Sequence, residues 1–346
     1  MVLSRPRVTL PAMTRAAPLV CLAAAVIIWA TTFVVSSTAL ASTSPAVLTV
    51  LRFALAAIVL VPLALRRGGM GRVFLAPITA VLGLTGVAAY YGLQNLGLLQ
   101  TPAGTAALLQ AVLPVATAVL AAVLLGERQS AGTVAGLVAA TAGVALVASA
   151  GAHVDRGAAL VVAGVLAYAI YTVLLRRLGS SPPHSGTAGS GHSDSDAVVL
   201  AAATALWGLI FLIPWLVWET ASGQAGLPAG PSAVAATLYL GVVGSGGTLL
   251  LWTYGAAHTP ASLAGIVTAA IPALGYAVAV FAGEPATWGK TAGGFLAVAG
   301  VLIATYAATR STSGTAPSPA TSSPLGHRDQ GRAELLPDPG RDAAPG

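Results

Sequence analysis

The chain has 346 residues, of which 56% are hydrophobic and only 8% charged, and its mean hydropathy is +0.84. Because soluble domains carry ~25% charged residues, this composition excludes an ordinary water-soluble protein. The single cysteine, Cys21, excludes a disulfide framework and a multi-cysteine metal site. The formal net charge of +6 does not indicate nucleic-acid binding, since Lys and Arg are scattered between apolar segments instead of clustered.

Apolar segments recur from residue 18 to residue 308, and each is long enough to cross a hydrocarbon core ~30 Å thick as a helix. We therefore predict an all-α, polytopic membrane protein with ten transmembrane helices. The expected spans lie near residues 18–40, 45–65, 74–97, 102–125, 132–150, 157–176, 196–218, 233–257, 261–282 and 287–308.

Three polar segments lie outside these spans. Residues 1–16 and the Ser/Pro/Gly-rich residues 309–346 cannot bury a core, so we expect disordered, cytoplasmic ends. Residues 178–195 are interpreted as a flexible cytoplasmic linker, and a solvated loop is favoured over a metal site at its two histidines. The chain divides into a first five-helix unit, residues 17–150, and a second, residues 157–308, and the linker follows the first helix of the second unit.

Positive charges indicate which helix ends face the cytoplasm, because Lys and Arg in short loops favour that side. With ten spans and a cytoplasmic N-terminus, the outside loops hold only Arg156 and Lys290. The cytoplasmic segments hold Arg5, Arg7, Arg15, Arg66, Arg67, Arg72, Arg128, Arg176, Arg177, Arg310, Arg328, Arg332 and Arg341. We therefore expect a multi-pass protein of the cell membrane, inner or plasma, with both termini in the cytoplasm.

An internal repeat relates the two halves of the chain. The matches at an offset of 158 residues are Gly83 with Gly241, Gly86 with Gly244, Gly97 with Gly255, Thr101-Pro102-Ala103 with Thr259-Pro260-Ala261, and Pro114 with Pro272. Those at an offset of 157 are Gly126-Glu127 with Gly283-Glu284, Gly136 with Gly293, and Gly143 with Gly300. Composition bias alone would not keep Gly, Pro and Glu in step over such a distance.

Five helices per repeat is an odd number, so the second repeat must cross the membrane in the opposite orientation. Inverted repeats are typical of secondary transporters, whose substrate site lies near the midplane between the halves. A channel or a non-transporting scaffold stays open as an alternative. An enzyme is disfavoured, because Val243 breaks the nucleophile-elbow pattern at Ser245 and no intramembrane carboxylate is available to orient His258.

Several short motifs are distributed along residues 18–308. They are Trp29-Ala30-Thr31-Thr32-Phe33, Arg52-Phe53, the run containing Tyr91, Asn95, Thr101, Ala103 and Pro114, Gly126-Glu127-Arg128, and the echo in Pro272 and Gly283-Glu284. Together they resemble the drug/metabolite transporter superfamily, specifically its ten-helix EamA-type members. The resemblance implies a transporter, often an exporter, of small metabolites, amino acids or drug-like compounds. The implied partners are a small-molecule substrate and the lipid bilayer, with a homodimer left open and no cofactor.

Residues 136–144 and 293–301 resemble the packing helix of small multidrug-resistance relatives. Those relatives carry an essential Glu in their first helix, which this chain lacks, so proton coupling through that carboxylate is not implied. GxxxG spacing, which lets helices approach closely, occurs at Gly132 and Gly136 and again at Gly289 and Gly293.

Arg52 is the one basic residue expected well inside a span, where a charge costs at least about 2.5 kcal/mol. One interpretation is that Arg52 attracts an anionic or carboxylate-bearing substrate. The other is that it snorkels, or bonds to carbonyl groups and fixes the second helix. Transport measurements on Arg52→Ala would separate the two.

The other cavity candidates are polar or aromatic. Tyr91, Gln94 and Asn95 share one face of the third helix, which must turn away from lipid, and Gln110 can reach in from the fourth. The aromatic candidates with their neighbours are Trp29, Thr32, Phe33, Tyr168, Tyr171, Trp252 and Tyr254. Bonding between helices and anchoring at the membrane interface are the alternatives for these side chains.

Pro114 and Pro272 fall in mid-span, where each removes a backbone hydrogen bond and bends its helix. They are candidates for gating, with static packing as the alternative. Glu127 and Glu284 are expected at helix ends near water, in solvated or capping roles. We expect no catalytic residue and no metal site.

Overall fold

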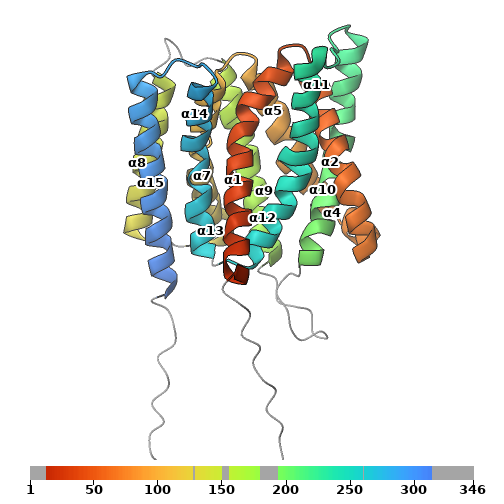
Figure 1. Ribbon diagram of the computed structural model, residues 1–346. Coiled ribbons are helices and arrows are strands. Elements are labelled where there is room, and N and C mark those ends of the chain that lie inside the picture. The colour runs from red at the N-terminus through yellow and green to blue at the C-terminus, as the bar shows by residue number, and fades with distance from the viewer. Residues whose placement is uncertain (1–12, 128, 150–155, 180–193, 260, 314–346) are drawn as a thin grey trace, which may run out of the picture.

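The computed structural model of the chain describes residues 13–127, 129–149, 156–179, 194–259 and 261–313. Every regular element within these residues is helical, as the composition predicts. Long helices stand side by side and form one bundle, with helix ends at its upper and lower faces (Figure 1).

Each half of the chain contains one π-helical segment, η1 or η2, between α-helices. The elements of the first half are α1 (Met13–Leu40), α2 (Pro45–Arg67), α3 (Met70–Leu75), α4 (Pro77–Gly83), η1 (Leu84–Ala89), α5 (Tyr90–Leu98), α6 (Ala103–Leu109), α7 (Val112–Leu125) and α8 (Ala131–Ser149). Those of the second half are α9 (Arg156–Gly179), α10 (Asp194–Ala221), α11 (Gly230–Leu238), η2 (Tyr239–Gly247), α12 (Thr248–Ala257), α13 (Ala261–Thr268), α14 (Ile271–Phe281) and α15 (Trp288–Ser313).

Within the described residues, nine helical stretches are long and apolar enough to cross a membrane. The third expected span, residues 74–97, is not among them. It is helical from Pro77 to Leu98 through α4, η1 and α5, but polar side chains such as Gln94 and Asn95 lower its hydropathy. Length and composition of the described residues therefore identify nine candidate spans, and they do not confirm the tenth that the sequence predicts.

Some helices run past the expected boundaries. α1 begins at Met13, within the segment expected to be disordered, and α15 continues to Ser313, within the expected tail. Helix formation does not require an apolar side chain, so polar residues can extend a span into the aqueous layer. The remaining residues of the expected disordered ends and linker, 1–12, 180–193 and 314–346, lie outside the described residues.

Several helix pairs join the halves of the chain, and two of them have extensive contacts. α2 packs along α10 on one side of the bundle, and α8 packs along α15 at the opposite edge (Figure 1). In the α8–α15 pair, a Cβ atom added at Gly136 would lie 2.6 Å from the carbonyl oxygen of Gly300. One added at Gly143 would lie 2.6 Å from that of Gly293. Glycine is therefore needed on both helices for their backbones to approach so closely.

Some prolines stand where helices start or are interrupted, whereas Pro18, Pro62 and Pro214 lie inside continuous helices. Pro45 opens α2, where a missing N–H group costs nothing. Pro114 lies in the first turn of α7, directly after the break that separates α6 from α7. Pro272 holds the matching place in α14, after the break from α13. Both prolines thus lie directly after an interruption between two helices, and their role in gating stays a prediction.

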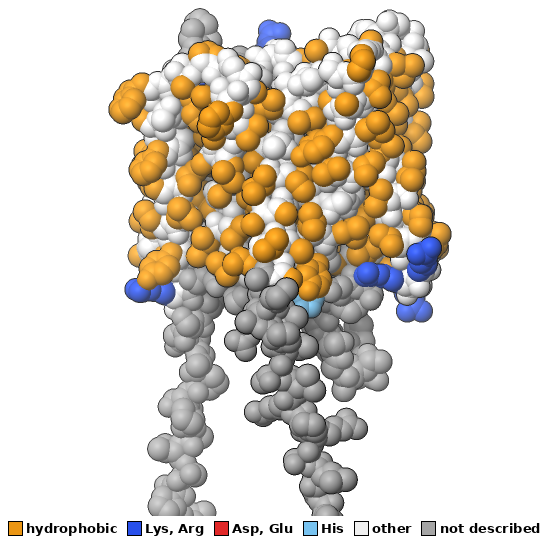
Figure 2. Space-filling model, viewed as in Figure 1, with side chains coloured by type: hydrophobic (Ala, Val, Ile, Leu, Met, Phe, Trp, Pro, Cys, Tyr) orange, Lys and Arg blue, Asp and Glu red, His pale blue; other side chains and the backbone are white. Residues whose placement is uncertain are grey.

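The outer surface of the bundle suits a lipid environment. Large apolar side chains, such as Ile58 and Phe295, are exposed around the side of the molecule, where Figure 2 shows a broad hydrophobic surface. Lys and Arg side chains gather at the ends of the bundle instead (Figure 2). This division is the one expected of a protein whose middle is surrounded by hydrocarbon.

Candidate functional site

Arg52 lies on the inward face of α2, with a side chain that is only 1% exposed. Its Nε donates a hydrogen bond to the Ser245 hydroxyl of η2 at 2.8 Å, and its Cζ lies 4.3 Å from the centre of the Tyr91 ring. Its Nη1 has no hydrogen-bond partner among the described residues. No carboxylate of the described chain lies within ion-pair distance of Arg52. A buried cation therefore faces the interior with part of its hydrogen-bonding capacity unused.

Aromatic rings continue from Arg52 across the bundle. Tyr91 packs against Phe53 at 4.8 Å and against Tyr90 at 4.6 Å between ring centres. Tyr90 in turn contacts Tyr168 of α9 at 4.6 Å, and Tyr168 contacts Tyr171 at 5.0 Å. These rings connect the first half of the chain to the second through contacts that are favourable between aromatic side chains.

A cavity of about 80 Å³ lies beside this cluster. Its walls come from α1, α2, η1 and α5 of the first half and from α9, α10, η2 and α12 of the second. The lining residues are Trp29, Phe53, Ala56, Leu60, Gly86, Val87, Tyr91, Tyr168, Tyr171, Ala201, Thr204, Ala205, Gly244, Ser245 and Leu249. Small-molecule sites usually measure ~300–1,000 Å³, so this cavity is nearly closed in the present conformation.

The two π-helical segments lie on the cavity wall. Gly86 of η1 and Gly244 of η2 both line the cavity, and they are the residues matched by the 158-residue repeat. A Cβ atom at Gly86 would lie 2.8 Å from a ring carbon of Tyr171, and one at Gly244 would lie 3.1 Å from Cγ2 of Thr32. Glycine is thus required for wall and aromatic ring to meet at Gly86. π-Helical turns are rare and occur often at functional sites.

Polar side chains form a second buried group between the cavity and the upper ends of α2 and α5. Asn95 donates a hydrogen bond from Nδ2 to the Thr49 hydroxyl at 2.9 Å, and Tyr90 donates one to Oε1 of Gln110 at 3.1 Å. Oδ1 of Asn95, Oε1 of Gln94 and Nε2 of Gln110 have no hydrogen-bond partner among the described residues. Unused polar atoms of this kind are costly to bury and call for a solvent or ligand explanation.

The structure brings together only part of the predicted set. Trp29, Tyr91, Tyr168 and Tyr171 line the cavity, with Arg52 directly against it. Thr32 touches the wall at Gly244, Phe33 lies in the neighbouring apolar core, and Trp252 packs on Trp29 at 5.4 Å. Gln94, Asn95 and Gln110 form the polar group just described.

Tyr254 lies apart from the cavity. It is 40% exposed, and its ring packs against His258 at 4.6 Å. Nδ1 of His258 lies 2.9 Å from the carbonyl oxygen of Tyr254, whereas Ser245 is bonded to Arg52. The serine and histidine considered for an enzyme thus have different partners.

Sequence analysis missed two buried contacts between the halves of the chain. Ser245 was considered only as a nucleophile, although it is the partner of Arg52 across 193 residues. Glu219 was not considered at all, although it is only 3% exposed and its carboxylate accepts hydrogen bonds from the backbone N–H of Ala46. The position of Glu219, between an apolar span and a Gly-containing loop, was the available signal. Glu284 caps a helix, as expected, because its carboxylate accepts hydrogen bonds from the backbone N–H of Gly104 in α6.

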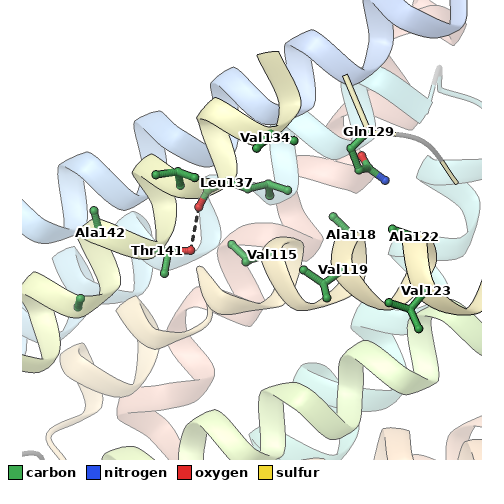
Figure 3. Close-up of a pocket in the computed structure, with 12 residues that line it drawn as sticks. Val115, Ala118, Val119, Ala122, Val123, Gln129, Val134, Leu137, Thr141 and Ala142 are labelled. Atoms are coloured by element: carbon green, nitrogen blue, oxygen red, sulfur yellow. Dashed lines mark hydrogen bonds between the residues drawn. The ribbon is translucent and has the colours of Figure 1, made fainter. Parts of the chain in front are cut away.

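A second hollow lies on the outer surface of the bundle, away from Arg52. A groove of about 630 Å³ runs between α7 and α8 (Figure 3), and its walls are apolar apart from Gln129 and Thr141. The Thr141 hydroxyl is bonded to the carbonyl oxygen of Leu137 on its own helix. With wall residues such as Val119 and Val138 exposed on the lipid-facing side, this groove suits hydrocarbon chains and lacks the polar groups of a substrate site.

A helical membrane bundle with a buried polar and aromatic cavity between its two halves is the architecture of a membrane transport protein. The chain belongs to the EamA-like transporter family, whose model matches residues 17–149 and 155–306. It is therefore a multi-pass membrane transporter of small molecules, and transporters of this kind are in general not enzymes.

Three relatives agree with this class. The chain is 34% identical, over 66% of its length and 72% of the relative's, to a protein of Streptantibioticus cattleyicolor named "Probable terminal-alkyne amino-acid exporter". It is 26% identical to an "Uncharacterized transporter" of Archaeoglobus fulgidus, over 82% of this chain and 96% of the relative. It is 32% identical to another protein so named from Bacillus subtilis, over 46% of this chain and 53% of the relative.

A solved crystal structure has the same fold. It superposes with a TM-score of 0.59 at 21% sequence identity, and the match covers 85% of this chain and 98% of that one. At this identity the similarity concerns the fold alone.

Proposed function

We propose that the chain exports small carboxylate-bearing molecules, amino acids above all, by alternating access between two inverted five-helix repeats. The repeats are residues 17–150 and 157–308, and the tenth span is the helical segment from Pro77 to Leu98. This segment extends from α4 at the lower end of the bundle to α5 at the upper end (Figure 1), which supports a complete crossing.

Matching glycines make matching contacts, which supports the inverted repeats. Gly97 approaches α9, the first helix of the second half, and its counterpart Gly255 approaches α1, the first helix of the first half. Gly83 likewise approaches α10, and its counterpart Gly241 approaches α2. Each of these two contacts has an equivalent made by the matching glycine of the other half, as a two-fold relation between the halves requires.

The α8–α15 pair supports the same relation. Gly136 of α8 faces Gly300 of α15, and Gly143 faces Gly293. Because Gly136 matches Gly293 and Gly143 matches Gly300 in the repeat, the pair exchanges equivalent contacts, as a self-complementary interface does.

The charge distribution supports a cytoplasmic location for the lower face in Figure 1. α2, α9 and α15 end there, with Arg66, Arg67, Arg176, Arg177 and Arg310 in their last turns. Arg156 and Lys290 lie in the first turns of helices that begin at the opposite face. By the positive-inside rule the lower face is the inner face and the upper face the outer one.

The proposal about substrate rests on the guanidinium of Arg52, which has no carboxylate partner among the described residues. A buried charge without a counter-ion is costly, and an anion that binds beside it would remove much of that cost. A carboxylate can take two parallel hydrogen bonds from a guanidinium, which fixes its orientation as well as its charge. The neighbouring Tyr and Trp rings offer an apolar surface for a side chain.

The nearly closed cavity suits one step of a transport cycle. An amino acid does not fit in about 80 Å³ beside these rings, so the walls must move apart before substrate can enter. The walls come from both halves of the chain, so a rocking of one half against the other would open the cavity. The name of the Streptantibioticus relative agrees with amino acids as substrate and with export as direction.

Proteoliposomes test this proposal with a panel of amino acids and the same compounds as carboxamides. Wild-type protein is expected to carry the acids and not the amides. Arg52→Ala should lose transport on the order of 30-fold or more, because loss of one partner of a buried charge pair costs about 2–5 kcal/mol. Arg52→Lys should retain part of the activity. Arg66→Ala, an exposed arginine at the inner end of the same helix, is the matched control and should transport normally.

Two outcomes would contradict the proposal. If Arg52→Ala lost expression and monodispersity together with transport, Arg52 would have a structural role. If acids and amides were carried equally well, the carboxylate would not be the recognised group. Saturation and counter-flow of labelled substrate would separate a carrier from a channel.

A further inference from the structure

Two carboxylates of the second half reach backbone N–H groups of the first half at the outer face. Glu219, near the end of α10, places both carboxylate oxygens 3.1 and 3.2 Å from the backbone nitrogen of Ala46, in the first turn of α2. Glu284, after α14, places both oxygens 3.1 Å from the backbone nitrogen of Gly104, at the start of the span Ala103–Leu125. Each span thus begins under an anion supplied by the other half.

These caps replace the local ones that a sequence normally provides. Ser44 stands at the N-cap position of α2, where its hydroxyl would usually accept a bond from the first turn. Here the Ser44 hydroxyl makes no capping bond, and it is buried without a partner among the described residues. Pro102 at the N-cap of α6 has no side-chain acceptor to offer. The free N–H groups of both helices therefore depend on Glu219 and Glu284.

Neighbouring loops reinforce the contact at the outer face. The backbone N–H of Ser44 donates to the carbonyl oxygen of Gly226 at 3.0 Å. The Ser42 hydroxyl lies 3.3 Å from the carbonyl oxygen of Ala229 and 3.2 Å from its nitrogen. All these bonds join the segment between α1 and α2 to the segment between α10 and α11. They hold the two halves together above the cavity.

The repeat counterpart of Glu284 is bonded differently. Glu127 lies at the inner face, where its carboxylate is 3.8 Å from Arg176 and both side chains are about half exposed. The atom that corresponds to the Gly104 nitrogen is the backbone nitrogen of residue 262, in the first turn of α13. Carboxylate and helix N-terminus thus occur at matching places on both faces, and at the outer face they are bonded together.

We propose that Glu219 and Glu284 are gate residues that hold the outer face closed, and that Glu127 has the same role at the inner face in the opposite state. This inference rests on the alternating access proposed above. When the outer face opens, Ser44 caps α2 in place of Glu219. When the inner face closes, Glu127 leaves Arg176 and caps α13. Because Ser44 and Glu127 act as caps when the contacts of the outer face are lost, most of these helix N-termini stay capped in both states. The change of state therefore costs little free energy.

Labelling of a buried cysteine from outside tests the gate. Ser36 is fully buried on α1, seven residues beyond Trp29 and so on the same helix face, between the cavity and the outer end. In a Cys21→Ala background, Ser36→Cys should react slowly with a membrane-impermeant maleimide. Glu219→Ala and Glu284→Ala should each accelerate the reaction several-fold. Gln224→Ala, an exposed side chain in the loop directly after α10, is the matched control and should not change the rate. Glu127→Ala should leave the rate unchanged or lower it.

A reversible cross-link gives a second test that does not remove the buried Glu219. Ser42→Cys with Ala229→Cys pairs two exposed positions across the closed outer face. Oxidation should block flux of the amino acid carried by the parent protein, and reduction should restore it. The inference is overturned if folded Glu219→Ala and Glu284→Ala both label at the parent rate, or if the oxidised pair transports normally. If labelling changes as expected while Arg52→Ala still carries amino acids, the gate stands and the proposed substrate class falls.

Discussion

The hydroxyl of Ser245 positions the one buried cation of the cavity. It accepts a hydrogen bond from Nε of Arg52, and the Tyr91 ring lies against the same guanidinium. With Nε held by a residue of the second half, Nη1 is left without a hydrogen-bond partner among the described residues. Arg52 therefore depends on both halves of the chain for its orientation, so relative motion of the halves would alter its affinity for an anion.

Removal of that hydroxyl should weaken substrate binding without loss of the fold. Hydrogen bonds to charged groups contribute about 1.5–3 kcal/mol, so Ser245→Ala should raise KM for a carboxylate substrate on the order of 10-fold or more. Ser245→Thr keeps the hydroxyl and should recover part of the affinity. Thr141→Ala, which removes a hydroxyl bonded only within α8, is the control for transport in the same liposomes. An unchanged KM in Ser245→Ala would show that the bond has no part in binding.

Among single residues, the sequence indicated candidates but not their partners. Arg52 and Tyr91 stand out because charged and polar side chains are costly inside a span. Ser245 does not stand out, since a serine between glycines is compatible with a turn, a packing site or a nucleophile. Its role depends on a residue 193 positions away, and a single sequence gives no information on that proximity.

Among the elements, glycine spacing predicted close packing, and the structure confirms it for α8 and α15. What spacing did not predict is the π-helical segments η1 and η2. Their ranges contain no proline and no distinctive motif, and the extra residue per turn is accommodated by tertiary packing against α9 and α2. The division of the third expected span into three pieces has the same origin.

The α8–α15 pair should be intolerant of any added side chain at its crossing. In Gly143→Ala the new methyl group would meet the carbonyl oxygen of Gly293 and the Cα of Ala297, which are backbone atoms that cannot rotate away. Overpacking of this kind costs about 1–3 kcal/mol, so the midpoint of thermal unfolding in detergent should fall by several degrees. Gly71→Ala is the control, because nothing lies within 4 Å of the added atom. Equal midpoints for the two variants would mean that α8 and α15 are not in close contact.

At the level of the whole molecule, the sequence predicted the class of protein and the lipid environment, and it is also the basis for the proposed duplication. These follow from composition, apolar length and constant offsets, which are properties of the chain as a whole. The sequence did not predict how the outer end is closed. The closure that we propose depends on contacts of Glu219 and Glu284 with backbone N–H groups 173 and 180 residues earlier in the chain.

The number of crossings can be decided by labelling two positions on either side of the disputed segment. Arg66 ends α2, and Lys290 opens α15. If the helix from Pro77 to Leu98 crosses the membrane, seven spans separate the two positions and they lie on opposite faces. If it does not cross, six spans separate them and they lie on the same face.

In a Cys21→Ala background, a membrane-impermeant maleimide should therefore label Lys290→Cys in intact cells and Arg66→Cys only in inside-out vesicles. The two single variants control for each other, since both replace a cationic side chain at a helix end by the same small thiol. Labelling of both positions from the same side would show that the helix from Pro77 to Leu98 does not cross the membrane. With an odd number of crossings in total, the two termini would lie on opposite faces, and the five-plus-five arrangement would be lost. Labelling from opposite sides but with the faces exchanged would keep the ten helices and reverse their orientation, and Glu219 and Glu284 would then close the cytoplasmic end.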